Sequence, residues 1–371
     1  MARSSRKSKQ GVFARRRHAV LRRMAGKTDA VLISRPEDVT HLSGFTGDSS
    51  FLVLGAGWAR LITDGRYGEQ AERECPDIPL HVRRGRVGQA VGEALKGRRV
   101  RRLAVQSDHV TVRFGEQLAK KLPTKRIRPL ADLVAPLRAV KDDDEVRAIR
   151  KAIRTAERAF RELLGMGRRR WIGRTERDIA AELNYRMCLA GADGPSFPTI
   201  VAAGAHGSLP HYCPGGTRIR PGDAVLIDWG AKVGGYCSDL TRVVFTGTIP
   251  PILAEIHDVV RRAQAAGIAA ARPGVSGGTV DAAARKVIDE AGYGERFMHS
   301  LGHGLGRQVH EAPGLGRTSK VRLRAGTVVT VEPGIYLPGV GGVRIEDDVL
   351  VTRGGPRRLS SLPRGMAALT L

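Results

Sequence analysis

The sequence is poor in cysteine, in aromatic residues and in acidic residues, and it has no long apolar run. Its 371 residues include only 4 cysteines, which are far apart and form no C-x-x-C pair, so neither a disulfide framework nor a zinc ribbon is indicated. No apolar stretch approaches the ~20 residues that a membrane helix needs, and no apolar signal segment follows the basic N-terminus. We therefore expect a protein of the reducing cytoplasm without a membrane partner.

Acidic residues are outnumbered by basic ones. Asp and Glu number 37 against 62 Lys and Arg, which gives a formal net charge of +25. This excess raises nucleic acid or another polyanion as a partner. The arginines are spread along the whole chain, however, including an expected helix at 146–164, whereas a binding footprint clusters on one face. The scatter favours a general preference for arginine over a dedicated nucleic-acid site.

Composition and patterning divide the chain into three parts. Residues 1–23 carry many Arg and Lys and no Asp or Glu, which is typical of a disordered tail that could bind a polyanion weakly through its phosphates, and also of a transit peptide. Residues 24–140 alternate short strands with helices, which predicts an α/β domain. Near residue 140 the sequence changes to LRAVKDDDE, whose acidic run can cap a new helix. We place the start of the last domain, 141–371, there.

The elements expected in the α/β domain are short. Its turn Asp64-Gly65, within TDGRY, is interpreted as local scaffolding. The expected strands are 30–34, 51–54, 61–63 and 103–106, and the expected helices are 87–95 and 112–121.

The last domain repeats one plan. Two expected helices, 144–164 and 175–190, precede a hairpin-like segment, and two more, 252–271 and 279–291, precede another. No residue-level repeat accompanies this plan. The pattern predicts an α+β domain made of two similar halves.

The first hairpin-like segment, 224–245, reads AVLIDWGAKVGGYCSDLTRVVF, with two apolar runs around a Gly-rich turn at 232–235. This pattern predicts a β-hairpin. If its strands pair about the middle of the turn, Asp228 and Asp239 face each other, and their carboxylates are close neighbours. Two like charges in an apolar sheet are costly unless a cation lies between them. The segment therefore predicts a metal site.

A second hairpin is predicted over residues 328–352. Glu332 and Glu346 are equidistant from Gly339 in its turn, so a second pair of facing carboxylates is expected. Strand alternation adds Thr241 to the face of Asp239, and it adds an arginine to the face of Glu346.

That arginine is Arg344, which lies between two acidic positions of an apolar strand. Its guanidinium can hold a metal-binding carboxylate through charge-assisted hydrogen bonds, and the Thr241 hydroxyl can bind a carboxylate or a bound water. An ordinary surface ion pair is the less favoured interpretation of Arg344.

Histidines lie between and before the hairpins. The Gly-rich segment FMHSLGHGLGRQVHEAPG carries His299, His303 and His310, and its glycines let the backbone approach a ligand closely. His211 lies in another loop, SLPHYCPGG, of the kind that supplies binding residues. Four carboxylates with histidine suit Mn²⁺ or Co²⁺. Two such ions ~3.5–4 Å apart would balance the charges and generate a hydroxide near neutral pH.

The order Asp228, Asp239, His303, Glu332, Glu346, within IDWGAKVGGYCSDLTR, SLGHGLGRQVHEAP and VEPGIYLPGVGGVRIED, resembles the pita-bread metallopeptidases of family M24. It is most similar to the branch of Xaa-Pro aminopeptidase (aminopeptidase P) and prolidase. The segments HLSGFTGDSS and TDGRY resemble the creatinase-like N-terminal domain of that branch. The resemblance implies an α/β N-terminal domain and an α+β pita-bread domain, in which an antiparallel sheet with pseudo-two-fold symmetry is flanked by helices.

The resemblance also implies a role for each matching metal ligand. Asp228 would chelate one ion, Asp239 and Glu346 would bridge both ions, and His303 with Glu332 would hold the other. Glu332 would in addition be the general base that takes a proton from the attacking water.

Further roles follow from the same resemblance. His211 and His310 would contact the substrate amide and the developing oxyanion. Arg344 is expected both to act with these catalytic residues and to hold a metal-binding carboxylate in place. His299 and Tyr336 would line the pocket for the proline.

Together with the metal ligands, the resemblance implies a metallo-exopeptidase that uses two divalent ions, Mn²⁺ before Co²⁺ or Zn²⁺, to cleave between an N-terminal residue and proline. Both longer peptides and Xaa-Pro dipeptides remain open as substrates. Because relatives are often dimers, a homodimer is expected. Two other functions remain open: a catalytically silent pita-bread protein that binds nucleic acid through its basic surface, and a non-peptidase hydrolase related to creatinase.

Overall fold

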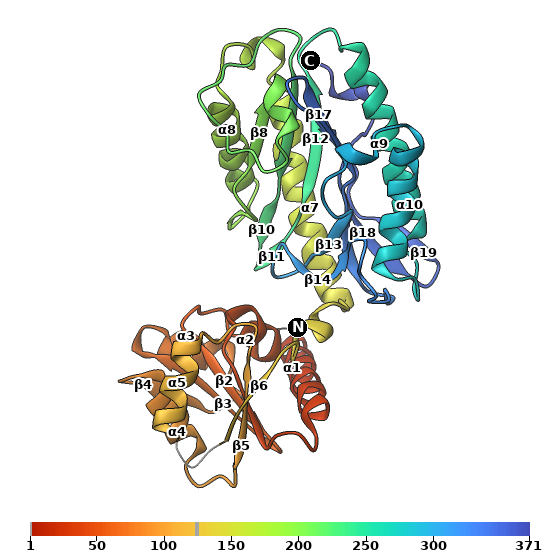
Figure 1. Ribbon diagram of the computed structural model, residues 1–371. Coiled ribbons are helices and arrows are strands. Elements are labelled where there is room, and N and C mark those ends of the chain that lie inside the picture. Colours follow the sequence, from red (N-terminus) through yellow and green to blue (C-terminus); the bar gives the residue numbers. More distant parts are fainter. Residues whose placement is uncertain (1, 123–125) are drawn as a thin grey trace. The chain divides into compact units, whose positions relative to one another are not determined.

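The structure is a computed structural model that describes residues 2–122 and 126–371. Its chain forms two compact units, Met1–Arg138 and Ala139–Leu371 (Figure 1). The division falls two residues before the boundary predicted between residues 140 and 141. Within the described ranges, no helix is long and apolar enough to cross a membrane.

The first unit is built on one six-stranded sheet. Its strands are β1 (Ala30–Ile33), β2 (Phe51–Gly55), β3 (Trp58–Asp64), β4 (Leu80–Arg83), β5 (Arg102–Gln106) and β6 (Arg126–Leu130), and its helices are α1 (Ala2–Met24), α2 (Pro36–Ser43), α3 (Gly68–Glu74), α4 (Val87–Leu95), α5 (Val112–Lys121) and α6 (Ala135–Arg138). The sheet order is β4-β3-β2-β1-β5-β6, and β1 pairs antiparallel with β2 but parallel with β5. All expected strands and helices are present, whereas β4, β6, α1, α2, α3 and α6 were not expected.

Both faces of this sheet are covered. In β1, Val31 and Ile33 belong to one buried cluster and Ala30 and Leu32 to another, as the alternation of side chains along a strand requires. The α/β prediction for this unit agrees with this arrangement. Asp64 contacts Arg66 and Arg83 of the same unit at 2.9 and 3.1 Å, which fits the scaffolding role expected for it.

Helix α1 occupies the region where a disordered tail was predicted. Its side chains Val20 and Met24, 0% and 2% exposed, lie in the core that α1 shares with α2 and β1. Arg16 and Arg17 donate hydrogen bonds to backbone oxygens of α2 at 3.0 and 3.1 Å. This corrects the prediction for residues 11–23. The dense positive charge concealed two apolar side chains one helical turn apart, which dock the helix.

The second unit consists of two halves. Its helices are α7 (Asp143–Leu164), α8 (Glu176–Leu189), α9 (Pro251–Ala270) and α10 (Gly277–Glu290), each within two residues of its predicted bounds. Its strands are β7 (Gly194–Pro195), β8 (Ile200–Ala203), β9 (Ala224–Trp229), β10 (Ala231–Val233), β11 (Tyr236–Cys237), β12 (Leu240–Phe245), β13 (Gly302–Gly304), β14 (Glu311–Leu315), β15 (Val328–Val331), β16 (Gly334–Leu337), β17 (Gly341–Arg344), β18 (Asp347–Thr352) and β19 (Gly355–Arg358).

These strands form antiparallel sheets. The first half contains the orders β12-β9-β8 and β11-β10-β7, and the second half contains β14-β13-β15-β18-β19 and β16-β17. Helices α7 and α8 belong to the first half, and α9 and α10 to the second (Figure 1). The predicted α+β architecture is confirmed.

Local sequence explains where the helices of the first half begin. Asp142 and Glu145 form a capping box at the start of α7, and Thr175 and Asp178 form another at the start of α8. Each box satisfies backbone N–H groups that have no partner within the helix. The acidic run that marked the domain boundary therefore does act as a helix cap.

The first hairpin is present, but its register differs from the predicted one. Its turn consists of Gly234 and Gly235, with φ of +58° and +76°. A two-residue turn with both residues at positive φ favours glycine, and it centres the hairpin one residue later than assumed. As a result Asp228 pairs with Thr241 and not with Asp239. Asp239 lies between β11 and β12.

The second hairpin has the predicted register. The ladders β15–β18 and β16–β17 are both centred on Gly339, whose φ is +77°. In the gap between the two ladders this register places Glu332 opposite Glu346. The two hairpins meet at a bridge between Thr241 and Glu346, where the Glu346 N–H donates to the Thr241 carbonyl at 3.2 Å.

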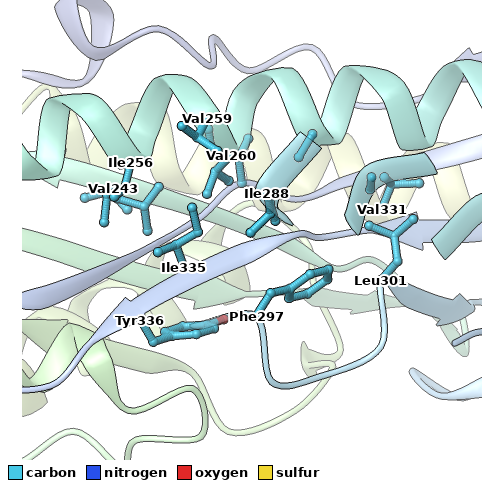
Figure 2. Packing of buried hydrophobic residues seen from close by; sticks show 14 of the residues in the cluster. Val243, Ile256, Val259, Val260, Ile288, Phe297, Leu301, Val331, Ile335 and Tyr336 are labelled. Atoms are coloured by element: carbon cyan, nitrogen blue, oxygen red, sulfur yellow. The ribbon is translucent and has the colours of Figure 1, made fainter. Parts of the chain in front are cut away.

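An apolar core fixes the second hairpin against the helices of its half. Figure 2 shows Val260 of α9 facing Val243 of β12 and Ile335 of β16, all of which are buried. The next residue of β16, Tyr336, lies on the other side of the strand (Figure 2). Both side chains are buried. Because side chains alternate along a strand, Ile335 packs towards Val260, whereas Tyr336 points towards Arg344, to which it is hydrogen-bonded.

Candidate metal centre

A cavity of about 520 Å³ lies in the second unit where the two hairpins meet. Most of the predicted site residues line it: His211, Asp228, Asp239, His299, His303, His310, Glu332, Arg344 and Glu346. Thr241 and Tyr336 do not line the cavity but contact residues that do. Segments more than 130 residues apart in the sequence thus contribute to one site.

The carboxylates reach the cavity from the ends of strands. Asp228 is near the end of β9, and Asp239 directly precedes β12. Glu332 and Glu346 occupy the gap between the two ladders of the second hairpin, just after β15 and just before β18. Since the bridge at Thr241 joins the hairpins, it brings the four carboxylates together even though Asp228 and Asp239 are not cross-strand partners.

His303 lies in β13 between two glycines that touch neighbouring backbone. A Cβ at Gly302 would be 2.1 Å from the Thr330 carbonyl oxygen, and one at Gly304 would be 2.3 Å from that of Ala312. These glycines therefore permit close approach of β13 to its neighbours in the sheet, where we expected close approach to a ligand.

The hydrogen bonds of His303 fix its tautomer. Its Nδ1 lies 3.2 Å from the Gly304 carbonyl oxygen, which can only accept, so Nδ1 carries the hydrogen. The Nε2 atom then faces Glu332 Oε1 at 3.3 Å and Asp239 Oδ2 at 3.6 Å. Glu332 raises the pKa of His303 against the effect of burial, so without a cation Nε2 also holds a hydrogen. When a metal ion takes the place of that hydrogen, the imidazole in this tautomer presents the lone pair that ligation requires.

The donor set fits a divalent cation. Ligand atoms of Asp239, His303 and Glu346 all lie within 4.8 Å of one another. Asp228 Oδ1 and Glu346 Oε1 are buried, and neither has a hydrogen-bond partner among the described residues. Because a buried carboxylate oxygen without a partner is costly, both atoms are well suited to bind a cation.

The pKa shifts of the four carboxylates also favour a bound cation. Burial and the neighbouring carboxylates raise the pKa of Asp239 and of Glu346 well above the usual range, and burial raises the pKa of Asp228 despite the nearby Arg344. Burial also acts to raise the pKa of Glu332, but the hydrogen bond and charge of His303 outweigh it and lower that pKa. Adjacent carboxylates that resist ionisation need either protons or cations, and a divalent ion supplies the charge.

Arg344 connects both hairpins. Its Nη2 donates to Asp228 Oδ2 at 2.6 Å, and its Nε donates to Thr241 Oγ1 at 3.1 Å. The Thr241 hydroxyl in turn donates to Glu346 Oε2 at 2.7 Å. Arg344 thus holds Asp228 directly and Glu346 through Thr241, whereas the sequence only suggested that it would hold a carboxylate on its own strand.

Tyr336 and His299 continue this network. Arg344 Nη1 donates to the Tyr336 oxygen at 2.8 Å, and that oxygen lies 2.8 Å from His299 Nε2. His299 Nδ1 faces the Ser300 carbonyl at 2.8 Å and so carries the hydrogen, which leaves Nε2 to accept from the Tyr336 hydroxyl. Burial lowers the pKa of His299 and raises that of Tyr336 to about 12, so both are neutral. Tyr336 therefore supports the pocket from behind.

His211 and His310 are exposed and lie at the cavity. The rings of His310 and His303 are 4.3 Å apart and nearly perpendicular. Partial desolvation of the His310 ring at the cavity and the neighbouring His303 lower the pKa of His310, so its ring is neutral and one nitrogen can donate a hydrogen bond into the cavity.

Both units match known families. Residues 147–353 match the model of metallopeptidase family M24, and residues 16–140 match the creatinase/prolidase N-terminal domain. The chain belongs to metallopeptidase family M24. The resemblance stated from the sequence motifs is thereby confirmed, and so are the pita-bread fold of the second unit and the enzyme class.

This M24 peptidase is similar to several named relatives over nearly its whole length. It is 36% identical to an Xaa-Pro dipeptidase of Pyrococcus horikoshii, over 91% of this chain and 93% of the relative. The solved structure of an Xaa-Pro dipeptidase from Bacillus anthracis is 34% identical, with a TM-score of 0.92, covering 97% of this chain and 100% of the other. The solved structure of an X-Pro aminopeptidase from Thermotoga maritima is 36% identical, with a TM-score of 0.87, covering 94% of this chain and 99% of the other.

The structure of the M24 peptidase also contains site residues that the sequence did not single out. The Asp239 N–H donates to Asp348 Oδ2 at 3.2 Å, and Asp348 is fully buried. Arg242, also fully buried, donates to the Glu346 carbonyl at 2.6 Å and to Asp347 Oδ1 at 2.7 Å. The run Glu346-Asp347-Asp348 inside an apolar strand was the signal that could have revealed these supports, because such charges need partners when they are buried.

Proposed function

We propose that this M24 peptidase uses two divalent metal ions to hydrolyse the bond between an N-terminal residue and proline. The observation that carries the proposal is the convergence of Asp228, Asp239, His303, Glu332 and Glu346 on one cavity. A single ion needs fewer negative ligands than four carboxylates, whereas two ions balance them. Carboxylate oxygens with one imidazole favour Mn²⁺, with Co²⁺ or Zn²⁺ as substitutes.

The metal ions would polarise the scissile carbonyl and acidify the attacking water. Glu332, whose carboxylate lines the cavity and lies 3.3 Å from His303 Nε2, is placed to accept the proton of that water as a general base. His211 and His310 offer hydrogen-bond donors to the oxyanion that develops on the substrate carbonyl. Arg344 orients Asp228 and favours its ionised form against the effect of burial, because its guanidinium contacts that carboxylate at 2.6 Å.

The names of the relatives support proline as the second residue. The similar proteins from Pyrococcus horikoshii and Bacillus anthracis are named Xaa-Pro dipeptidases, and the one from Thermotoga maritima is named an X-Pro aminopeptidase. A catalytically silent protein that binds nucleic acid is not favoured, since the candidate ligands are all present and the relatives named here are peptidases.

The proposal is tested by assaying Mn²⁺-loaded protein on Xaa-Pro dipeptides, on Xaa-Pro-Yaa tripeptides and on matched peptides with alanine in place of proline. We expect cleavage that depends on both the metal and the proline. Asp239→Asn should lower kcat by at least ~100-fold, because it removes a ligand expected to bridge both ions. Asp258→Asn is the control, since Asp258 is a surface residue of α9 paired with Arg261 at 2.7 Å.

Loss of proline dependence would refute the substrate assignment while leaving the metal centre intact. Full activity of the Asp239→Asn variant would refute the ligand assignment. The ratio of dipeptide to tripeptide cleavage distinguishes a dipeptidase from an aminopeptidase.

A further inference from the structure

Glu176, the first residue of helix α8, is a buried carboxylate outside the metal centre, with 0% of its surface exposed. It accepts hydrogen bonds from the Ala203 N–H at 2.8 Å, from His206 Nδ1 at 2.9 Å, from the Tyr212 hydroxyl at 2.8 Å and from the Gly215 N–H at 3.1 Å. Within the described part of the chain it has no ion pair with Lys or Arg. All of these hydrogen-bond donors to the carboxylate lie in one segment, residues 203–215.

This segment forms one wall of the catalytic cavity. Pro210, His211 and Tyr212 line the cavity, and the Pro210 carbonyl accepts a hydrogen bond from Arg344 Nη1 at 3.4 Å. The ring of Tyr212 stacks on His206 with centroids 4.5 Å apart. Tyr212 thus contacts Glu176 through its hydroxyl and follows His211 directly in the chain.

The Tyr212 hydroxyl is a dependable donor to Glu176. Burial and the Glu176 carboxylate raise the pKa of Tyr212 to about 12, so the hydroxyl keeps its hydrogen throughout the working range of a peptidase. A charged acceptor makes this bond and the two backbone bonds stronger than neutral ones.

The second half of the unit has a comparable device at its own histidine-bearing loop. Asp281 of α10, 1% exposed, accepts from the Leu301 N–H at 3.0 Å and forms a bidentate pair with Arg285 at 3.0 Å. Arg285 also donates to the carbonyls of Phe297 and His299, both at 2.9 Å. In both halves, a buried carboxylate from the second helix holds a loop that brings a histidine to the cavity.

We propose that Glu176 is a positioning residue for peptide hydrolysis, which fixes the cavity wall so that His211 meets the substrate in a productive orientation. The proposal rests on the proposed peptidase function and on the role proposed there for His211. It assigns Glu176 no contact with the substrate or the metal ions. Its effect should therefore pass through the segment 203–215 and leave the metal ligands unchanged.

The first test is the variant Glu176→Gln, which keeps the shape of the side chain. An amide offers one acceptor oxygen and directs its NH₂ group towards donors, so at least one of the N–H groups of Ala203 and Gly215 loses its partner. We expect kcat to fall about 10- to 100-fold, because a catalytic group is displaced, with Mn²⁺ content per chain unchanged. Tyr212→Phe removes a single hydrogen bond and should give a smaller loss in the same direction if Glu176→Gln does not fold.

A double-mutant cycle with His211→Ala separates positioning from general stability. If Glu176 acts through His211, the double variant loses no more activity than His211→Ala alone. The matched control is Glu157→Gln. Glu157 is a helix carboxylate, 2% exposed, that accepts from the Ser361 N–H and hydroxyl and the Leu362 N–H. The residues it holds, 361–362, do not line the cavity, so its effect should be additive with that of His211→Ala.

Hydrogen exchange gives a readout that does not depend on activity. Glu176→Gln should speed exchange of the amides in residues 203–215, and Glu157→Gln should not. Unchanged exchange there, or additive losses in the Glu176/His211 cycle, would overturn the proposal. A different outcome is that the wild type cleaves no Xaa-Pro substrate while Glu176→Gln still speeds exchange in residues 203–215. That outcome would refute the proposed function and leave the anchoring by Glu176 in place.

Discussion

At the scale of single residues, the buried charges of the second unit differ in whether the protein itself satisfies them. Arg242 and Asp347 pair at 2.7 Å with both side chains 0% exposed. Asp228 and Glu346 each keep one oxygen without a partner among the residues described. Buried charges that lack a protein partner are expensive. Their presence in one cavity is the physical reason to place metal ions there rather than elsewhere in the unit.

His257 in α9 gives a prediction at this scale. It is 1% exposed, and burial, helped by the nearby Arg261 and Arg242, lowers its pKa from 6.5 to about 4. Between these pH values the unfolded chain binds a proton that the folded chain rejects, so His257 destabilises the fold as pH falls from 6.5 towards 4. The penalty can reach about 3 kcal/mol. We expect His257→Phe, which keeps an aromatic ring beside Phe245, to lose less stability than the wild type over that range.

The measurement is urea unfolding of both proteins from pH 7.5 to pH 4 in excess chelator, so that metal binding does not contribute. The difference in unfolding free energy between variant and wild type should rise in favour of the variant as pH falls. A difference that is independent of pH would contradict the assignment.

At the scale of elements, the short strand β13 positions His303. It lies between β14 and β15 and consists of His303 with a glycine on each side. The glycines leave no room for a Cβ because neighbouring carbonyls lie within 2.3 Å of where it would be. The lack of side chains at these positions lets the strand sit close enough for His303 to reach the carboxylates of the second hairpin.

Gly302→Ala should therefore disturb the centre through backbone displacement. We expect a loss of about 1–3 kcal/mol of stability from overpacking and weaker Mn²⁺ binding, measured by urea unfolding of the metal-free protein and by metal titration. Gly314→Ala in β14 is the matched control, because a Cβ there meets no atom within 4 Å. Equal metal affinity of the two variants would contradict this account of β13.

At the scale of the whole molecule, the second unit unites ligands from both of its halves. Asp228 and Asp239 belong to the first half, and His303, Glu332 and Glu346 belong to the second. The protein contacts that join the halves at this point include the bridge between Thr241 and Glu346. Bound metal ions would add links across the same junction. The expected homodimer stays a prediction, which light scattering can check.

Metal removal should therefore weaken the whole second unit. A ligand that binds only the folded chain stabilises it by about 2.7 kcal/mol at a free concentration of 100 times Kd. We expect Mn²⁺ to raise the urea midpoint of the wild type and of Asp258→Asn, and to have little effect on Asp239→Asn. An equal effect on all three proteins would indicate binding outside the proposed centre.

The sequence by itself determined the four long helices of the second unit and the set of candidate ligands. Helical periodicity and caps located α7 and α8, because these signals act within a few residues. The symmetry about Gly339 was enough to pair Glu332 with Glu346, since strand pairing about a turn is a local rule. The charge of residues 1–23, in contrast, concealed a helix, because the burial of Val20 and Met24 depends on partners elsewhere in the first unit.

Only the tertiary structure decided how the candidate ligands are arranged. The first hairpin turns at Gly234 and Gly235, both at positive φ, so its register is one residue later than the predicted one. Asp228 and Asp239 are therefore not cross-strand partners, and they come together at the junction of the two hairpins. The contact of Arg344 with Asp228 and the anchoring of residues 203–215 by Glu176 join segments distant in sequence. No local pattern encodes such contacts, because they depend on how separately formed elements pack together.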